Sequence, residues 1–187
     1  MDMNAMAEGN GRRGGGTPWR LVGWGGAAAL LAVPAVAMLF TKEVNWGGED
    51  FLFAAILFAL VGLGVELTVR ASPSWTWRAG AGLAVFSCFA LVWVNAAVGM
   101  IGDGGNAYNF AFVGLVPLAI AGAAVARLRA GRMAAAMLAI GIAQVAIAAS
   151  GFSVDRLGAT FSMVMAGPWL LSAGLFLLAA RREKAAR

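Results

Sequence analysis

Six runs of apolar residues, each close to 20 residues long, constrain the fold of this chain more than any other feature. An α-helix rises about 1.5 Å per residue, so roughly 20 apolar residues cross the hydrocarbon core of a bilayer. The runs lie at about 21–40, 51–69, 79–101, 110–126, 133–150 and 157–180. They are continuously apolar, whereas the strands of a membrane barrel alternate over about 10 residues. The sequence therefore predicts an all-α, polytopic membrane bundle of six transmembrane helices.

The composition is typical of an integral membrane protein. Hydrophobic residues make up 61% of its 187 residues and charged residues 12%, which is too apolar for a water-soluble domain of this size. We expect a disordered cytoplasmic tail at 1–18, a six-helix transmembrane domain at 19–182 and a basic cytoplasmic tail at 183–187. In an alternative interpretation the first apolar run belongs to a cleaved signal peptide, which leaves five spans and an outside N-terminus.

The basic residues predict the orientation in the membrane. With a cytoplasmic N-terminus, twelve of the fourteen lysines and arginines fall inside, and only Lys42 and Arg156 fall outside. This asymmetry is the positive-inside bias, so we expect both termini to be cytoplasmic. The net charge of +5 is thereby explained by topology and by contact with the lipid bilayer, and no nucleic-acid partner is expected.

The chain lacks residues that several kinds of catalytic and metal site require. The chain has no histidine, which excludes histidine-ligated haem, histidine metal sites and histidine general bases. Its single cysteine, Cys88, lies inside the third span and is interpreted as a packing residue. We therefore expect no catalytic residues, no metal site, no cofactor and no enzymatic activity.

Two charged residues near the inner end of the second span form a candidate ion pair. Glu66 precedes Arg70 by four positions, which places both side chains on one helical face in the favoured order. Pairing accounts for both charges. Because a carboxylate inside a membrane is also a candidate functional group, proton or cation coupling stays open as an alternative.

Two amides are predicted at the same depth below the outer surface. Asn95 lies six residues before the end of the third span, and Gln144 lies six residues before the end of the fifth. An unpaired amide in hydrocarbon costs several kcal/mol, so each is expected to face protein. We predict that each amide is the hydrogen-bond partner of the other.

Further polar residues are expected to gather at the outer side. Asp103 lies in a glycine-rich turn, and either Asn106 or Asn109 is expected to cap the fourth helix. The acidic Asp50 is expected to stabilise the start of the second helix. The complete candidate outer cluster is Asp50, Trp93, Asn95, Asp103, Asn106, Tyr108, Asn109 and Gln144.

Small residues and prolines predict local features of the later spans. Ala135, Ala139 and Ala143 form a ridge of small residues on which another helix could approach closely. Pro117 and Pro168 are expected to bend the fourth and sixth helices.

Several of these stretches together resemble a known family. They are WGGEDF at 46–51, Glu66, LVWVNAAVGMIG at 91–102 with the turn through Asn109, and RLRAGRMAAAM at 127–137. In these the chain resembles a family of small uncharacterised bacterial inner-membrane proteins. The resemblance implies a location in the bacterial inner membrane and implies no activity.

Two functions are compatible with the sequence. The first is a non-catalytic accessory or scaffolding subunit that packs against a larger membrane complex or a second copy of the chain. The second is a small-solute transporter, or the substrate-binding membrane subunit of one, with an outward-facing polar pocket. The general architecture of the second is similar to that of the substrate-binding components of energy-coupling-factor vitamin transporters.

Overall fold

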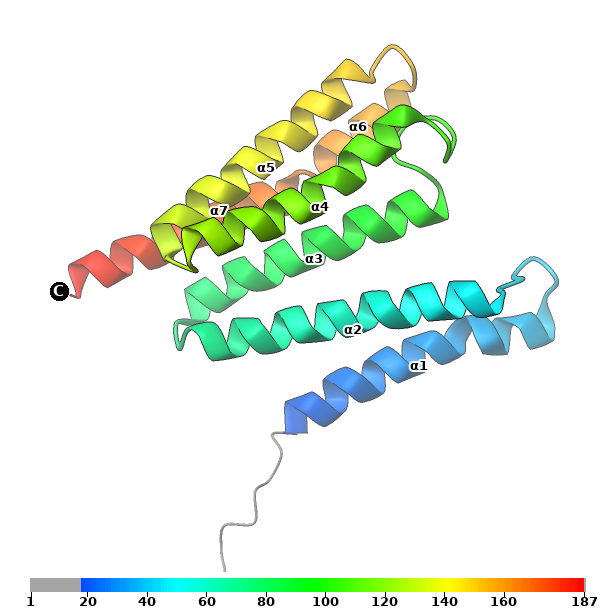
Figure 1. Cartoon of the computed structure of the whole chain (residues 1–187), viewed down its shortest axis with the longest axis horizontal. Coiled ribbons are helices and arrows are strands. Elements are labelled where there is room, and N and C mark those ends of the chain that lie inside the picture. Colours follow the sequence, from blue (N-terminus) through cyan, green and yellow to red (C-terminus); the bar gives the residue numbers. More distant parts are fainter. Residues whose placement is uncertain (1–17, 187) are drawn as a thin grey trace, which may run out of the picture. The chain divides into compact units, whose positions relative to one another are not determined.

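The computed structural model describes residues 18–186, and over this range the chain forms seven α-helices and no strand (Figure 1). The helices are α1 (Pro18–Phe40), α2 (Gly48–Ala71), α3 (Trp75–Ala97), α4 (Ala107–Ala126), α5 (Ala130–Ser150), α6 (Arg156–Val164) and α7 (Gly167–Ala185). Six stretches of the described chain are long and apolar enough to cross a membrane, with α6 and α7 forming one stretch. The predicted all-α membrane bundle with six spans is confirmed.

The ends of the chain differ in how much is described. The predicted N-terminal tail lies outside the described residues except for Pro18, which begins α1. At the other end, α7 continues through Arg182 to Ala185, so most of the predicted basic tail is helical. Contacts divide the chain into two compact units, Met1–Gly62 and Leu63–Arg187, and the division falls inside α2.

In the first unit, α1 and the first part of α2 are joined by a short turn. The Trp24 indole packs on Gly62, where an added Cβ would lie 2.8 Å from the ring. Glu49 and Asp50 occupy the first turn of α2, and the Asp50 carboxylate accepts a hydrogen bond of 2.8 Å from the Gly47 N–H. The predicted role of Asp50 at the start of this helix is therefore confirmed.

In the second unit, four helices surround one apolar core. Helix α3 packs on α4 and α7, and α5 packs on the same two helices. The largest fully buried apolar side chains include Trp169, Phe112, Phe176, Leu91 and Met137. Core residues come from all four of these helices. The unit therefore has a buried apolar core of its own, although most of its outer surface is also apolar and suits contact with lipid.

Glycines let α7 approach its two neighbours closely. An added Cβ at Gly80 of α3 would lie 3.3 Å from the Ser172 carbonyl, and one at Gly141 of α5 would lie 2.8 Å from Leu170. Ala135 and Ala139 of the predicted ridge on α5 are exposed, so the other helices of the second unit do not cover them. The buried face of α5 follows a different line of residues, namely Ala130, Ala134, Met137, Gly141, Gln144 and Ala148.

The predicted sixth span is interrupted. Helix α6 ends at Val164 and α7 begins at Gly167, with Pro168 in its first turn. Proline has no N–H to donate and its ring displaces the preceding carbonyl, so a helix commonly breaks there. The bend predicted at Pro168 is confirmed, whereas α4 continues through Pro117 without interruption.

Candidate functional site

The candidate outer cluster is centred on Asn109, in the first turn of α4. Its side chain is 5% exposed. The amide oxygen accepts hydrogen bonds from the N–H groups of Met100 at 2.8 Å and Ile101 at 3.0 Å. The amide nitrogen donates to the carbonyls of Asp103 at 2.7 Å and Ile101 at 3.3 Å. Four bonds fill the capacity of this amide, which holds the α3–α4 connection against the bundle.

Two glycines allow the connection to wrap around Asn109. Gly99 has φ +78° and Gly102 has φ +65°, both in the left-handed region that favours glycine. An added Cβ on Gly99 would also lie 3.0 Å from the Asn109 amide nitrogen. The glycine-rich turn therefore serves to bring backbone groups to one buried side chain.

The neighbouring polar residues are engaged in the same region. Asn106 is the N-cap of α4, and its side chain accepts a bond of 3.1 Å from the Tyr108 N–H. The Tyr108 hydroxyl donates to the Ser150 carbonyl at 3.0 Å, which joins α4 to the end of α5. The predicted cap of α4 by Asn106 is confirmed, whereas Asn109 holds the preceding loop.

Asp155 belongs to this cluster although the sequence analysis did not select it. It is the N-cap of α6, and its carboxylate accepts bonds from the Gly158 N–H at 2.9 Å and the Gly102 N–H at 3.0 Å. These bonds stabilise the charged form and hold the pKa of the Asp155 carboxyl below its ordinary value. An aspartate directly before an apolar helix is a recognisable N-cap signal, but its bond to Gly102 is visible only in the fold.

Gln144 lies beneath the cluster with no exposed surface. Its amide nitrogen donates to the Ser162 carbonyl at 2.9 Å, and its oxygen accepts from the Trp169 indole N–H at 2.8 Å. The Ser162 hydroxyl in turn donates to the Met100 carbonyl at 3.2 Å. A chain of hydrogen bonds thus runs from α5 and α7 through α6 to the α3–α4 connection.

Asn95 does not take part, so the predicted pairing of Asn95 with Gln144 is wrong. Its amide nitrogen donates to the Leu91 carbonyl in its own helix at 3.0 Å, and its buried oxygen has no hydrogen-bond partner in the described chain. Equal depth was not enough, because Gln144 turns toward the break between α6 and α7. There the interrupted helix leaves a carbonyl that an amide can satisfy.

The other candidates have separate surroundings. The Trp93 ring stacks on Phe89, with 5.6 Å between ring centroids. Asp50 belongs to the first unit and is engaged at the start of α2. At the opposite end of α2, Glu66 and Arg70 form the predicted ion pair. The structure thus brings together Asp103, Asn106, Tyr108, Asn109 and Gln144 with the added Asp155.

The residues of the candidate outer cluster that lie together hold neighbouring segments of the chain in place with Asp155, and we call this group the outer clasp. Its amides and carboxylate bond to backbone groups and to the Trp169 indole, and two cavities of the second unit lie elsewhere. Among residues 18–186, no three potential metal ligands of the types His, Cys, Asp and Glu lie together. The described side chains of the cluster thus form bonds within the chain, and the outward polar recess that the sequence suggests stays a prediction.

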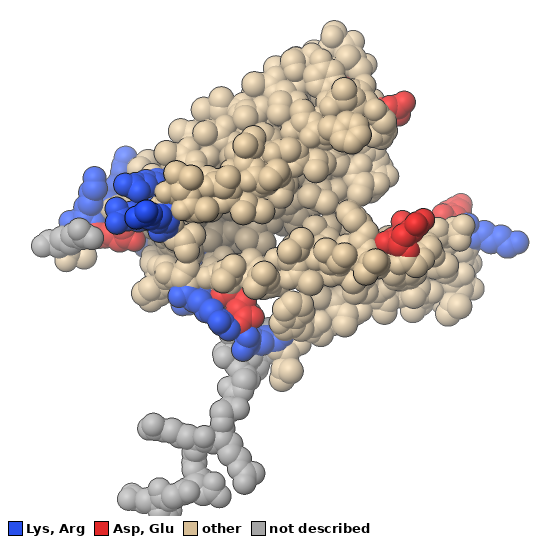
Figure 2. All heavy atoms as spheres, viewed as in Figure 1, with Lys and Arg blue, Asp and Glu red and all other residues tan. Residues whose placement is uncertain are grey.

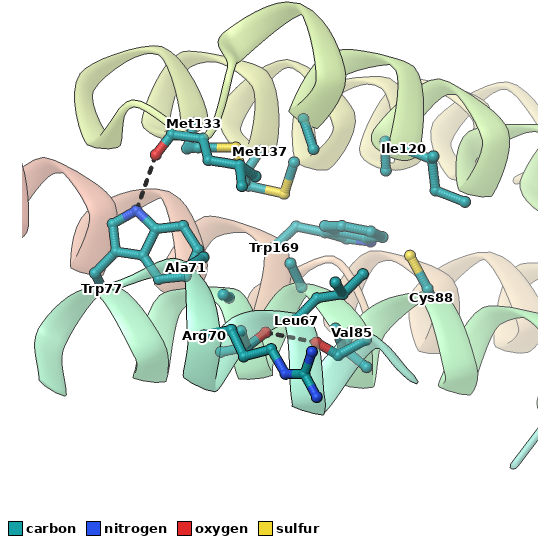
Figure 3. A pocket seen from close by; sticks show the side chains of 17 residues that line it. Leu67, Arg70, Ala71, Trp77, Val85, Cys88, Ile120, Met133, Met137 and Trp169 are labelled. Carbon is teal, nitrogen blue, oxygen red and sulfur yellow. Dashed lines mark hydrogen bonds between the residues drawn. The ribbon is translucent and has the colours of Figure 1, made fainter. Parts of the chain in front are cut away.

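A cavity of about 430 Å³ lies in the second unit between the end of α2, the first half of α3, and α4 and α5. Its lining is almost entirely apolar, with Met133 and Met137 on one side, Cys88 and Val85 on the other, and the Trp169 ring between them (Figure 3). The guanidinium of Arg70 points away from this space in the same view. Sequence reasoning missed the cavity, because its walls come from segments far apart in the chain.

A second cavity, of about 580 Å³, adjoins the first and has a mixed polar and apolar lining. Ala71, Trp77 and Leu128 line both cavities. The Trp77 indole N–H donates to the Leu128 carbonyl at 3.2 Å, which fixes a ring that lines both cavities (Figure 3). The second cavity also contacts Arg129 and Lys184, at the end of the second unit where basic side chains gather (Figure 2).

Nearby bonds hold this basic end together. Arg78 donates to the carbonyls of Ser72 at 2.6 Å and Val69 at 2.9 Å, which ties the start of α3 to the end of α2. Arg182 of α7 donates to the Thr76 hydroxyl at 2.8 Å. The walls of both cavities are therefore anchored by side chains that the charge pattern alone assigned only to topology.

Comparison of the chain with protein-family models, curated proteins and solved structures finds no match.

Proposed function

We propose that this protein is a non-catalytic accessory subunit of a complex in the bacterial inner membrane, with both termini in the cytoplasm. The orientation is supported by the positive-inside distribution of arginine and lysine. The membrane assignment is supported by the resemblance of the segments around Asp50, Asn95 and Arg127 to inner-membrane proteins. Topology reporters fused after Gly104 and after Arg187 test the orientation directly.

The observation that carries this proposal is an exposed small-residue face on α1. No residue in the most apolar stretch of α1 is buried. Ala27, Leu31 and Pro34 are half-buried along one side of the helix. The opposite side carries Gly25, Ala29, Ala32 and Val36, which are all exposed and spaced at helical intervals.

Such a face suits another transmembrane helix better than it suits lipid. Lipid tails are as apolar as leucine, so helices associate in membranes chiefly through close packing, which small residues permit. At Gly25 an added Cβ would meet no atom within 4 Å, so no residue of the first unit covers the face at this position. A partner helix that packs there gains contact area without displacing a residue of the first unit.

The test is capture of a stoichiometric partner in mild detergent by the full chain and by Gly25→Leu. We expect the substitution to abolish capture, because a leucine would keep the two helices apart. The matched control is Gly174→Leu, which makes the same change at an exposed position of α7 where an added Cβ also meets no atom. A differently tagged second copy of the chain shows whether the partner is the protein itself.

Recovery of the wild-type chain as a lone monomer would contradict the proposal, as would equal capture by wild type and Gly25→Leu. The alternative function, a small-solute transporter with an outward polar pocket, receives less support. Asn109 and Gln144 are among its candidate solute-binding residues, but their side chains are occupied by backbone and indole groups.

A further inference from the structure

The linings of the two cavities of the second unit together suit an amphiphilic ligand. One is almost entirely apolar and lies within the span, among Ala84, Ala123, Met137 and Trp169. The other is partly polar and lies at the basic end of α7. Both are lined by Trp77, whose indole N–H donates to the Leu128 carbonyl. An apolar volume that opens beside a charged one, at the end of a membrane span, matches the arrangement of a lipid tail and its headgroup.

The apolar cavity is suited to a hydrocarbon chain. Its volume of about 430 Å³ is within the range of about 300–1,000 Å³ typical of ligand sites. A polar solute would lose its bonds to water there and find few replacements, which costs several kcal/mol for each unpaired group. The flexible thioethers of Met133 and Met137 adapt to irregular apolar shapes, as a site for an acyl chain requires.

The second cavity is suited to a negative charge. Arg129 and Lys184 both line it, and no hydrogen bond or ion pair of their side chains is found in the described part of the chain. Glu183 is the acidic residue of the lining, so the site carries a net positive charge. Basic residues near a membrane surface attract anionic lipid with about 1 kcal/mol each.

We propose that these cavities bind one anionic phospholipid, with an acyl chain in the apolar cavity and the headgroup phosphate on Arg129 and Lys184. The inference goes beyond the proposed accessory role and does not depend on it. A phosphate group alone would leave the apolar cavity unfilled, and a hydrocarbon chain alone would leave the two cations without a counterion. One molecule with both parts satisfies both observations.

The headgroup is tested by native mass spectrometry on the full chain in detergent, with phosphatidylglycerol and phosphatidylcholine of identical acyl chains. Wild type is expected to prefer phosphatidylglycerol. The double variant Arg129→Gln/Lys184→Gln should lower that affinity about thirtyfold, which is about 2 kcal/mol at about 1.4 kcal/mol per factor of ten. The matched control, Arg132→Gln/Arg181→Gln, removes two exposed charges that line neither cavity and should leave the preference intact.

The acyl chain is tested by filling the apolar cavity with Ala84→Phe. We expect at least a tenfold loss of phosphatidylglycerol binding, with the two headgroup cations unchanged. If that variant does not fold, Ala123→Leu adds less volume on the opposite wall and is measured instead. Inorganic phosphate serves as the probe of a headgroup-only site and should not compete at millimolar concentration.

Three results would overturn the proposal. They are equal affinity of wild type for the two lipids, equal loss in the charge variant and its matched control, and full binding by the cavity-filling variant. Because none of these measurements involves a protein partner, their failure is separate from failure of the accessory role.

Discussion

Replacing Gln144 by methionine removes the centre of the buried hydrogen-bond chain while nearly preserving side-chain shape. Two groups lose their partner, namely the Trp169 indole N–H and the Ser162 carbonyl, bonded at 2.8 and 2.9 Å. A buried group left unpaired costs about 1–3 kcal/mol, and hydrogen bonds inside membranes average about 0.6 kcal/mol with a maximum near 1.7 kcal/mol. We therefore expect Gln144→Met to lower the free energy of unfolding by about 2–3 kcal/mol.

The assay is reversible unfolding in mixed micelles with a rising fraction of denaturing detergent, followed by tryptophan fluorescence and circular dichroism. The matched control is Asn95→Leu, at the other amide of the predicted pair. Its side chain bonds only to the Leu91 carbonyl of its own helix and leaves its oxygen unpaired, so its removal orphans no further group. We expect Asn95→Leu to be neutral or stabilising by up to about 1 kcal/mol.

A free energy of unfolding for Gln144→Met within about 0.5 kcal/mol of wild type would mean that the bonds to α6 and α7 contribute no stability. Asn95→Leu should also be clearly less damaging than Gln144→Met. Equal damage would mean that the two amides support each other, as the sequence alone suggested.

Three further predictions concern the outer clasp. Asn109→Ala should speed amide hydrogen exchange in the α3–α4 connection by well over tenfold. Asn106→Ala removes one cap bond worth about 1 kcal/mol, so it should speed exchange mainly at the start of α4. Gly158→Ala should destabilise the chain, because its Cβ would lie 2.6 Å from a backbone carbonyl of that connection, whereas Gly104→Ala meets no atom and should change thermal stability little. Because the pKa of Asp155 is lowered in the folded chain, its carboxylate contributes stability above pH 3.8, its ordinary pKa, and this contribution is lost as pH falls through the lower folded pKa. Asp155→Asn should therefore weaken the fall in stability at acid pH, measured as the free energy of unfolding against pH.

Local interactions were predictable because they depend on neighbours in the chain. The apolar runs specify helices by length and composition alone, whatever surrounds them. Glu66 and Arg70 meet because a helix brings positions four apart onto one face. Asn106 caps α4 because its side chain reaches an N–H only two residues away.

The partners of the buried amides were decided by the tertiary structure. Each residue turns a helix by 100°, so two amides at equal depth face each other only if both helices have the right rotation, which packing at Gly80 and Gly141 determines. The break before Pro168 then supplies the carbonyl that Gln144 binds. The helices and the Asn106 cap were thus determined by the sequence, because they depend only on nearby residues. The clasp at Asn109 and the two cavities exist only in the fold, because their groups come from separate helices.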